Sequence, residues 1–306
     1  MNRVVVGSVL IAAGAFLIVL APLLRFQVAP ALSAAAGDYY GITKLRAAGA
    51  QYFSVPDGRV LTADLDIIVT TRGDVKEAAG DRVVWDEFTA VNDVTNSKAG
   101  IDFTERRSAF DKRSGVGLNC CGVNIDKAPV QLQGQIYKFP FDAEKKTYLV
   151  FNSSTGKAYE ARFVGEEKVN GLDTYKFEQA VPETKTQTLN APAAWFGMGT
   201  SGDVQLDRYY SGTVTYWVEP TTGAPVRQEQ QRNEVLKSQD GVERSKAFVA
   251  TAKMTDDTVQ RLVDSARDGK SQITLIRTTV PIVVGVVGLV LVVVGLLLTL
   301  RGRRTA

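Results

Sequence analysis

Two long uncharged apolar stretches bracket the chain. The second runs from Thr278 to Leu300 and is followed by Arg301, Arg303 and Arg304. A bilayer core requires about 20 apolar residues in helical conformation, and a helix satisfies its own backbone hydrogen bonds inside lipid. This stretch therefore predicts a transmembrane helix. The arginines that follow it place the tail of residues 301–306 in the cytoplasm.

The first apolar stretch, Val4 to Leu24, allows two interpretations. A signal peptide would be cleaved near Ala34-Ala35-Ala36, whereas a retained anchor would cover residues 1–24. Signal peptides have apolar cores of about 7–15 residues. This stretch is longer, and the alanines lie well beyond its end. We therefore predict a retained transmembrane anchor.

Two membrane helices joined by one large segment place both ends of the chain on the same side of the membrane. We expect a two-pass plasma-membrane protein with both termini cytoplasmic and residues 38–268 extracytoplasmic. Glycines recur along both helices: Gly7 and Gly14 in the first, and Gly285, Gly288 and Gly295 in the second. Small residues let helices approach closely, which favours either packing of the two anchors or a homo-oligomer.

Between the helices the apolar residues follow a period of two, which is typical of half-buried strands. The pattern is clearest from Arg59 onward. Further segments of this kind are 82–94, 101–111, 157–165, 173–181, 204–210, 213–218, 225–236 and 246–251. Asn170-Gly171 is a strong hairpin signal. The pattern predicts a mainly β (α+β) fold: an antiparallel β-rich extracytoplasmic domain over residues 59–254.

One turn sequence occurs three times, in Phe110–Gly115, Phe151–Gly156 and Val218–Gly223. Each begins at an apolar strand end and finishes with Ser or Thr followed by Gly. Glycine adopts positive φ without strain, so each sequence predicts a tight turn. The recurrence suggests two related meanders around an apolar groove.

The segments next to the membrane differ from this pattern. Residues 25–58 are the predicted juxtamembrane segment. Its part from Arg25 to Gln51 is rich in Ala and contains Pro and Gly, and we expect a stalk or short helix there. Residues 255–277 predict a juxtamembrane helix that begins with Thr255 as its cap. Val259 and Val263 lie on the apolar face of this helix.

An apolar insert between the strands contains Trp195, Phe196 and Met198, flanked by Gly and Pro. These three side chains are our candidate ligand-binding residues, as a lid on an apolar pocket. A membrane-touching tip and a loop packed into the domain's own core are the alternatives.

The chain has two cysteines, Cys120 and Cys121, which are adjacent. An extracytoplasmic location permits disulfides. We favour a vicinal disulfide that forms a rigid turn, because Asn119 and Gly122 suit a tight loop. Two free thiols and intermolecular bridging are the alternatives.

Composition restricts the chemistry further. The chain has no histidine, so the commonest general base and metal ligand is missing. The 36 Lys and Arg residues include four in the terminal tails, which leaves 32 against 33 acidic residues. A near-neutral domain argues against nucleic acid as a partner. We predict no catalytic residues, no metal site and no cofactor.

Several segments together resemble the actinobacterial porin PorA family. They are Asp38–Gly41, the turn at Phe110 leading into Asn119-Cys-Cys-Gly122, the stretch Tyr216–Val226, and the C-terminal apolar helix that ends in Arg. The resemblance covers nearly the whole chain. It implies a protein of the plasma membrane in a bacterium with a complex lipid envelope, and it brings no catalytic residues.

The hairpin from Trp217 to Arg227 is also similar to one in periplasmic lipoprotein carriers, which curve a sheet around an apolar cavity. We therefore favour a non-enzymatic envelope protein that binds or hands on a lipid or lipoconjugate. A subunit of a porin-like channel and an envelope scaffold protein are the alternatives.

Overall fold

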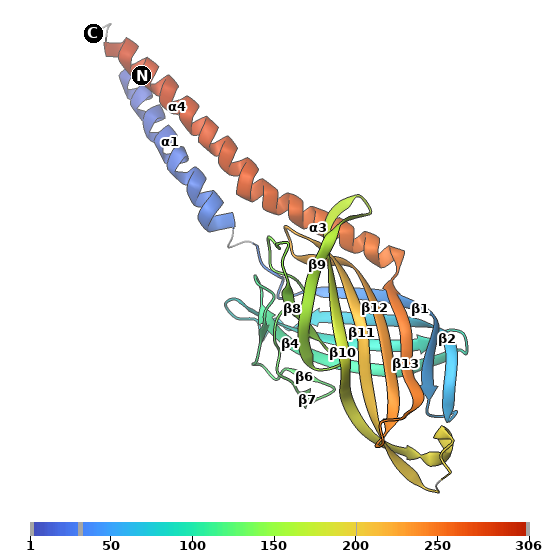
Figure 1. Cartoon of the computed structure of the whole chain (residues 1–306). Coiled ribbons are helices and arrows are strands. Elements are labelled where there is room, and N and C mark those ends of the chain that lie inside the picture. The colour runs from blue at the N-terminus through green and yellow to red at the C-terminus, as the bar shows by residue number, and fades with distance from the viewer. Residues whose placement is uncertain (1–2, 30–32, 200, 304–306) are drawn as a thin grey trace. The chain divides into compact units, whose positions relative to one another are not determined.

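The computed structural model describes residues 3–29, 33–199 and 201–303 (Figure 1). The chain divides into two compact units. A helical unit contains both ends of the chain, residues 1–34 and 267–306, and a β unit contains residues 35–266.

The helical unit contains the two predicted membrane helices. The first is α1 (Arg3–Leu23), which continues into a π-helical turn, η1 (Leu24–Val28). The second is α4 (Val280–Arg303), preceded by η3 (Leu275–Thr279). Both are long and apolar enough to cross a membrane. The N and C labels lie at the same end of this helix pair (Figure 1).

Glycines bring α1 and α4 into close contact. A Cβ added to Gly7 would lie 2.6 Å from the Gly295 carbonyl oxygen, and one added to Gly14 would lie 2.5 Å from that of Gly288. Gly285 is less tightly placed, with only the Ala21 methyl group nearby at 3.7 Å. The glycines therefore serve the packing of the two anchors in one chain. A homo-oligomer through them stays a prediction.

The β unit consists of antiparallel strands and one helix. The long strands are β1 (Tyr40–Ser54), β2 (Arg59–Gly73), β3 (Arg82–Asp93), β4 (Lys98–Asp111), β9 (Lys157–Val169), β10 (Leu172–Pro192), β11 (Asp203–Glu219), β12 (Ala224–Ser238) and β13 (Glu243–Met254). The short strands are β5 (Gly117–Leu118), β6 (Asn124–Ile125), β7 (Ala128–Pro129) and β8 (Tyr148–Asn152). A short 3-10 helix, η2 (Ala193–Phe196), follows β10.

All of these strands belong to one sheet, in the order β7-β6-β4-β3-β2-β1-β13-β12-β11-β10-β9-β8, with β5 added beside β4. The sheet is two meanders, β1 to β4 and β8 to β13, joined where β1 pairs with β13. Figure 1 shows the two meanders turning across one another, as a strongly curved sheet does. The predicted fold class, an antiparallel β-rich domain between terminal helices, is confirmed.

The sheet curls into a half-barrel that one segment closes at one end. This plug segment, residues 130–147, connects β7 to β8. Its Gln135 forms bridges with Val116, beyond the end of β4, and with Val150 in β8. One residue thus links the β4–β5 region of one meander to the edge strand β8 of the other.

The three recurrent turns have the predicted geometry. Gly115, Gly156 and Gly223 have φ angles of 76°, 66° and 68°. The N–H of each donates to the carbonyl oxygen four residues earlier, at 2.8, 3.0 and 2.9 Å. The plug segment rests on the first and third turns, because Ile136 N–H donates to the Gly115 carbonyl and Phe139 N–H to that of Gly223.

The prediction for residues 25–58 was wrong in secondary structure, because β1 occupies Tyr40–Ser54 within the sheet. Its buried residues alternate up to Ala47 and again from Ala50. A bulge at Gly49, where φ is 61°, interrupts the alternation between them. This bulge and the small alanine side chains hid the strand from the sequence pattern.

The predicted helix after Thr255 is confirmed as α3 (Asp256–Thr274). The Thr258 N–H donates to the Thr255 hydroxyl at 3.4 Å, as expected of a cap. Val259, Val263 and Ala266 are buried in a cluster with Trp217 and Val226 of the sheet.

Candidate functional site

The inner face of the half-barrel is identified by side chains that meet across it. Arg106 on β4 lies six strand positions from Tyr216 on β11. In a flat sheet, that separation would be about 29 Å at about 4.8 Å per strand. Yet the plug segment contacts both strands: the ring of Tyr137 lies 4.4 Å from the Arg106 guanidinium, and Phe139, two residues later, packs on Tyr216 with ring centroids 5.8 Å apart. These contacts require β4 and β11 to approach each other, so the face that carries both residues is the concave one.

A layer of charged residues lies on this inner face. On β3 and β4, Arg106 donates to Glu87 at 3.0 Å, and only 8% of the Arg106 side chain is exposed. The two residues stand opposite one another in the strand register. They balance each other's charge.

A second part of the charged layer lies on β11 and β12. The Glu234 side chain is 5% exposed and accepts hydrogen bonds from two arginines, Arg208 at 2.6 Å and Arg232 at 2.5 Å. The arginines remain accessible, with 30% and 19% of their side chains exposed. Arg232 also stacks over the ring of Phe248 at 4.7 Å. This triad leaves one positive charge in excess.

Asp102 completes the charged layer from the other wall. It lies on β4, on the same face as Arg106, and its side chain is exposed. Burial nevertheless raises its pKa, while Arg232 and Arg208 act to lower it. The Asp102 carboxyl group is thus accessible to water and also has protein around it, which is expected of a side chain in a water-accessible interior. Asp102 shares the concave face with the triad and lies on the other wall of the half-barrel.

The end closed by the plug segment is filled instead. Phe139 stacks on Phe177 at 4.6 Å and contacts Tyr148 edge-on at 5.3 Å. The ring of Tyr137 lies 4.4 Å from the Arg106 guanidinium and 5.0 Å from the ring of Trp85. Burial raises the pKa of Tyr137 to about 12, and Ser108 and Arg106 act in the opposite direction. No space for a large ligand is evident at this end.

Three buried polar atoms in this filled end have no well-formed hydrogen bond among the described residues: Arg106 Nε, the Ser108 hydroxyl and the Tyr137 hydroxyl. Ordered water normally satisfies such groups. The filled end is therefore polar in part, although its bulk is aromatic.

Away from the filled end, the inner face has an apolar region over β1, β2 and β13, with Val91 of β3 beside it. Leu45, Leu65, Ile67 and Phe248 form a buried cluster there with five small alanines. These side chains pack against one another and are covered. The apolar groove expected from the sequence is thus limited to this region, and charged residues occupy the neighbouring one.

The candidate ligand-binding residues lie in and after η2, at the β10–β11 end. Trp195 packs on Phe53, with ring centroids 5.8 Å apart, and Phe196 stacks on the same ring at 5.4 Å. Phe196 also joins a cluster with Leu206 and Leu236. Met198 is half-buried. The packing agrees with the alternative of a loop tucked against its own domain, and a lipid site at these residues stays a prediction.

Cys120 and Cys121 lie in the turn between β5 and β6, and both side chains are half-buried. Cys121 has a φ of 61°. Its carbonyl oxygen accepts a hydrogen bond from Arg107 Nε at 2.9 Å, which fixes the turn to β4. The vicinal disulfide stays a prediction.

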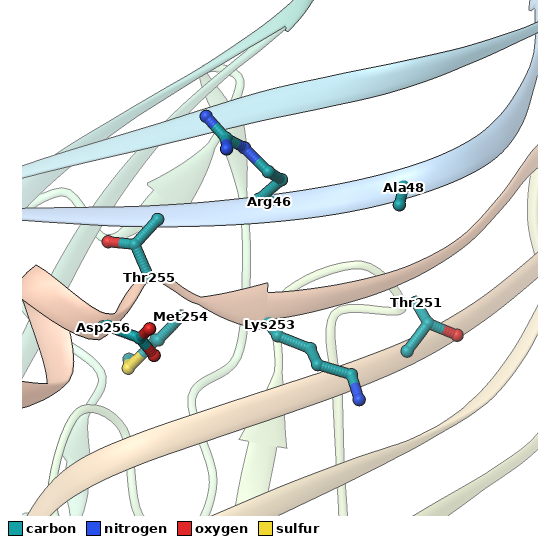
Figure 2. Close-up of a pocket in the computed structure, with 7 residues that line it drawn as sticks. All are labelled: Arg46, Ala48, Thr251, Lys253, Met254, Thr255 and Asp256. Atoms are coloured by element: carbon teal, nitrogen blue, oxygen red, sulfur yellow. The ribbon is translucent and has the colours of Figure 1, made fainter.

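A separate hollow of about 630 Å³ lies where β1 and β13 part at the Gly49 bulge (Figure 2). Its basic residues are Arg46 and Lys253. Figure 2 shows that these two side chains point away from each other. Each is also paired, Arg46 with Asp66 at 3.0 Å and Lys253 with Glu229 at 3.3 Å. The hollow therefore lacks converging groups for a ligand.

The charged layer was missed by the sequence analysis. Asp102, Arg106 and Ser108 alternate along a segment that was predicted to be a strand. Both faces of that segment carry polar residues, so the alternation does not show which face turns inward. Only the strand order and register show that Asp102 and Arg232 lie on the same inner face, on different walls.

Comparisons with known proteins agree on one family. The family model described as Porin PorA matches residues 6–297. A curated "Porin PorA" of Corynebacterium amycolatum is 28% identical over 231 residues, which cover 60% of each chain. A "Porin PorA" of Corynebacterium resistens is 26% identical over 278 residues, covering 69% of this chain and 67% of that protein. The chain thus spans 60% of the length of the first relative.

Proposed function

The chain belongs to the Porin PorA family, and on that premise we propose that it is a non-enzymatic subunit of a porin-like channel in the cell envelope. The relatives carry the name porin. For this chain, the channel role is supported by its own geometry, and first by the inner face of the half-barrel.

The observation that carries the proposal is the water-accessible charged layer. Asp102, Arg208 and Arg232 are reachable by water inside a curved sheet. An apolar cargo would have to desolvate these charges at a high cost. A path for hydrated solutes suits them better. In this proposal the charged layer lines the part of the path that the β unit provides.

The membrane helices impose a condition on the channel. The contact between Gly14 and Gly288 leaves no space between α1 and α4. A passage through the bilayer therefore requires several copies of the chain, with the helix pairs arranged around it. The strands do not supply the membrane passage, because a lipid-facing barrel needs a continuous apolar outer band. The outer side chains of β9, such as Glu160 and Arg162, are charged and exposed.

The orientation follows from the charges next to the helices. Arg301 and the basic residues after it favour a cytoplasmic C-terminus, and the second helix then places the N-terminus on the same side. In this orientation the β unit is extracytoplasmic and forms the outer vestibule of the channel.

Planar-bilayer recording tests the proposal. The full chain, purified in detergent and reconstituted at increasing protein-to-lipid ratios, should give discrete conductance steps in KCl. A matched variant, Gly14→Leu, should lose them, because a large side chain separates α1 from α4. Absence of steps from the wild-type chain at every ratio would contradict the proposal.

The same preparation tests the lipid hypothesis that the sequence favoured. Organic extraction and mass spectrometry would reveal a stoichiometric lipid, lost on Trp195→Asp. The exposed position of Trp195 makes this variant compatible with folding. A bound lipid together with no conductance would favour lipid handling over the channel.

A further inference from the structure

The charged layer has opposite charges on its two walls. On β4, Asp102 presents a carboxylate to the interior. On β11 and β12, Arg208 and Arg232 share a single buried carboxylate, that of Glu234. One wall is therefore negative at this level, and the opposite wall has an excess positive charge.

These walls belong to distant parts of the sheet. β4 and β12 are separated by β3, β2, β1 and β13. Five strand spacings would place them about 24 Å apart in a flat sheet. The curvature of the sheet brings these walls closer, because the plug rings Tyr137 and Phe139 contact Arg106 of β4 and Tyr216 of β11. The positive charges of Arg232 and Arg208 also act to lower the pKa of Asp102.

The arginine wall is rigid. Glu234 fixes both guanidinium groups at 2.5 and 2.6 Å, and Arg232 lies between the rings of Phe248 at 4.7 Å and Tyr210 at 5.9 Å. Asp102 has no comparable direct ion pair among the described residues. Its carboxylate is thus accessible to a passing ion.

From this arrangement we propose that Asp102 and the Arg208–Glu234–Arg232 triad act as a charge filter for small hydrated ions, with cations held towards the Asp102 wall and anions towards the arginine wall. The filter rests on the proposed channel function and adds its selectivity determinants. A unit charge about 8 Å away, screened by physiological salt, changes the local ratio of monovalent cations to anions roughly twofold. Removal of one wall should therefore shift selectivity by about that factor.

The test is the reversal potential of the reconstituted full chain in a KCl gradient. Asp102→Asn should raise the chloride-to-potassium permeability ratio about twofold, and Arg208→Gln should lower it about twofold. Asp102→Asn preserves shape at an exposed position, so it keeps the test valid if Arg208→Gln does not fold.

Glu105→Gln is the matched control, since Glu105 is an exposed acid on the outer face of the same strand. This variant should leave the ratio at the wild-type value. If the wild type conducts and Asp102→Asn matches Glu105→Gln, the filter is wrong while the channel stands. If the wild type does not conduct, the channel proposal fails, and the filter fails with it.

Discussion

The two ends of the inner face are built from similar antiparallel strands but differ in their side chains, which are packed aromatic rings at one end and accessible charges at the other. At the plugged end, aromatic side chains such as Phe139 and Phe177 fill the space between the sheet edges. In the charged layer, Asp102 is exposed and the arginines opposite it are partly exposed. Packing therefore holds the half-barrel together at one end, and that leaves the other free to carry charges that contribute little to stability. Substitutions at the two ends should separate these roles.

The largest effect is expected from Phe139→Ala. Phe139 is 2% exposed, and its ring joins β8, β10 and β11. Its loss should lower the free energy of unfolding by about 3–5 kcal/mol. Denaturant unfolding of the full chain in detergent, followed by tryptophan fluorescence, measures this. Phe103→Ala, at a 55% exposed site on the outer face, is the control and should cost below about 1 kcal/mol.

The second effect concerns the turn that supports the plug. At Gly223, φ is 68° and an added Cβ would overlap the carbonyl oxygens of Phe139 and Pro140. Gly223→Ala should cost about 3 kcal/mol, from backbone strain and from displacement of the plug. Gly171, at a φ of 79°, has nothing within 4 Å of an added Cβ. Gly171→Ala should therefore lower the free energy of unfolding by about 1 kcal/mol, from backbone strain alone. Equal costs at the two positions would contradict plug docking on this turn.

In the charged layer, Glu234→Gln removes the carboxylate shared by two arginines. The uncompensated charges should cost about 2 kcal/mol, less than for fully buried pairs because Arg208 and Arg232 stay partly exposed. Glu243→Gln breaks an exposed pair with Lys246 at 2.6 Å and should cost roughly 0–1 kcal/mol. A cost for Glu234→Gln as large as that for Phe139→Ala would erase the distinction between the two ends.

The last test is a pH dependence at the plug, measured as a change of stability with pH and not as a loss at one pH. Burial lowers the pKa of Lys138 to about 7 from its usual 10.5. Between these values the unfolded chain binds one more proton at this side chain, so its contribution to the free energy of unfolding rises with pH. Below about pH 7 the contribution is constant. The stability difference between Lys138→Met and wild type should therefore shrink from pH 7 to pH 10 in parallel unfolding titrations. A difference independent of pH would argue against a buried amine.

The sequence predicted the parts of the fold that depend on local chemistry. The alternation around Leu65 was sufficient to predict a strand, and the glycines of the three turns were sufficient to predict their geometry. Periodicity and positive φ are both properties of short segments. β1 was not predicted, because the bulge at Gly49 divides it into two short alternating pieces. The anchors were predicted from length and charge alone.

The candidate site depends on which strands meet, and no local pattern encodes that. Asp102 and Arg232 are 130 positions apart in the chain and share no motif. Trp195 and Phe196, in contrast, form a short apolar run, which was interpreted as a ligand-binding element. In the structure both rings pack on Phe53. Conspicuous apolar residues mark packing at least as often as ligand binding.

The contact between Gly14 and Gly288 has a consequence for biosynthesis. α1 is translated before the β unit and α4 after it, so the two helices cannot pair until the ribosome has translated all the residues between them. Throughout that interval the glycine face of α1 is uncovered in the bilayer. A product that stops before α4 therefore leaves Gly7 and Gly14 without their partner helix.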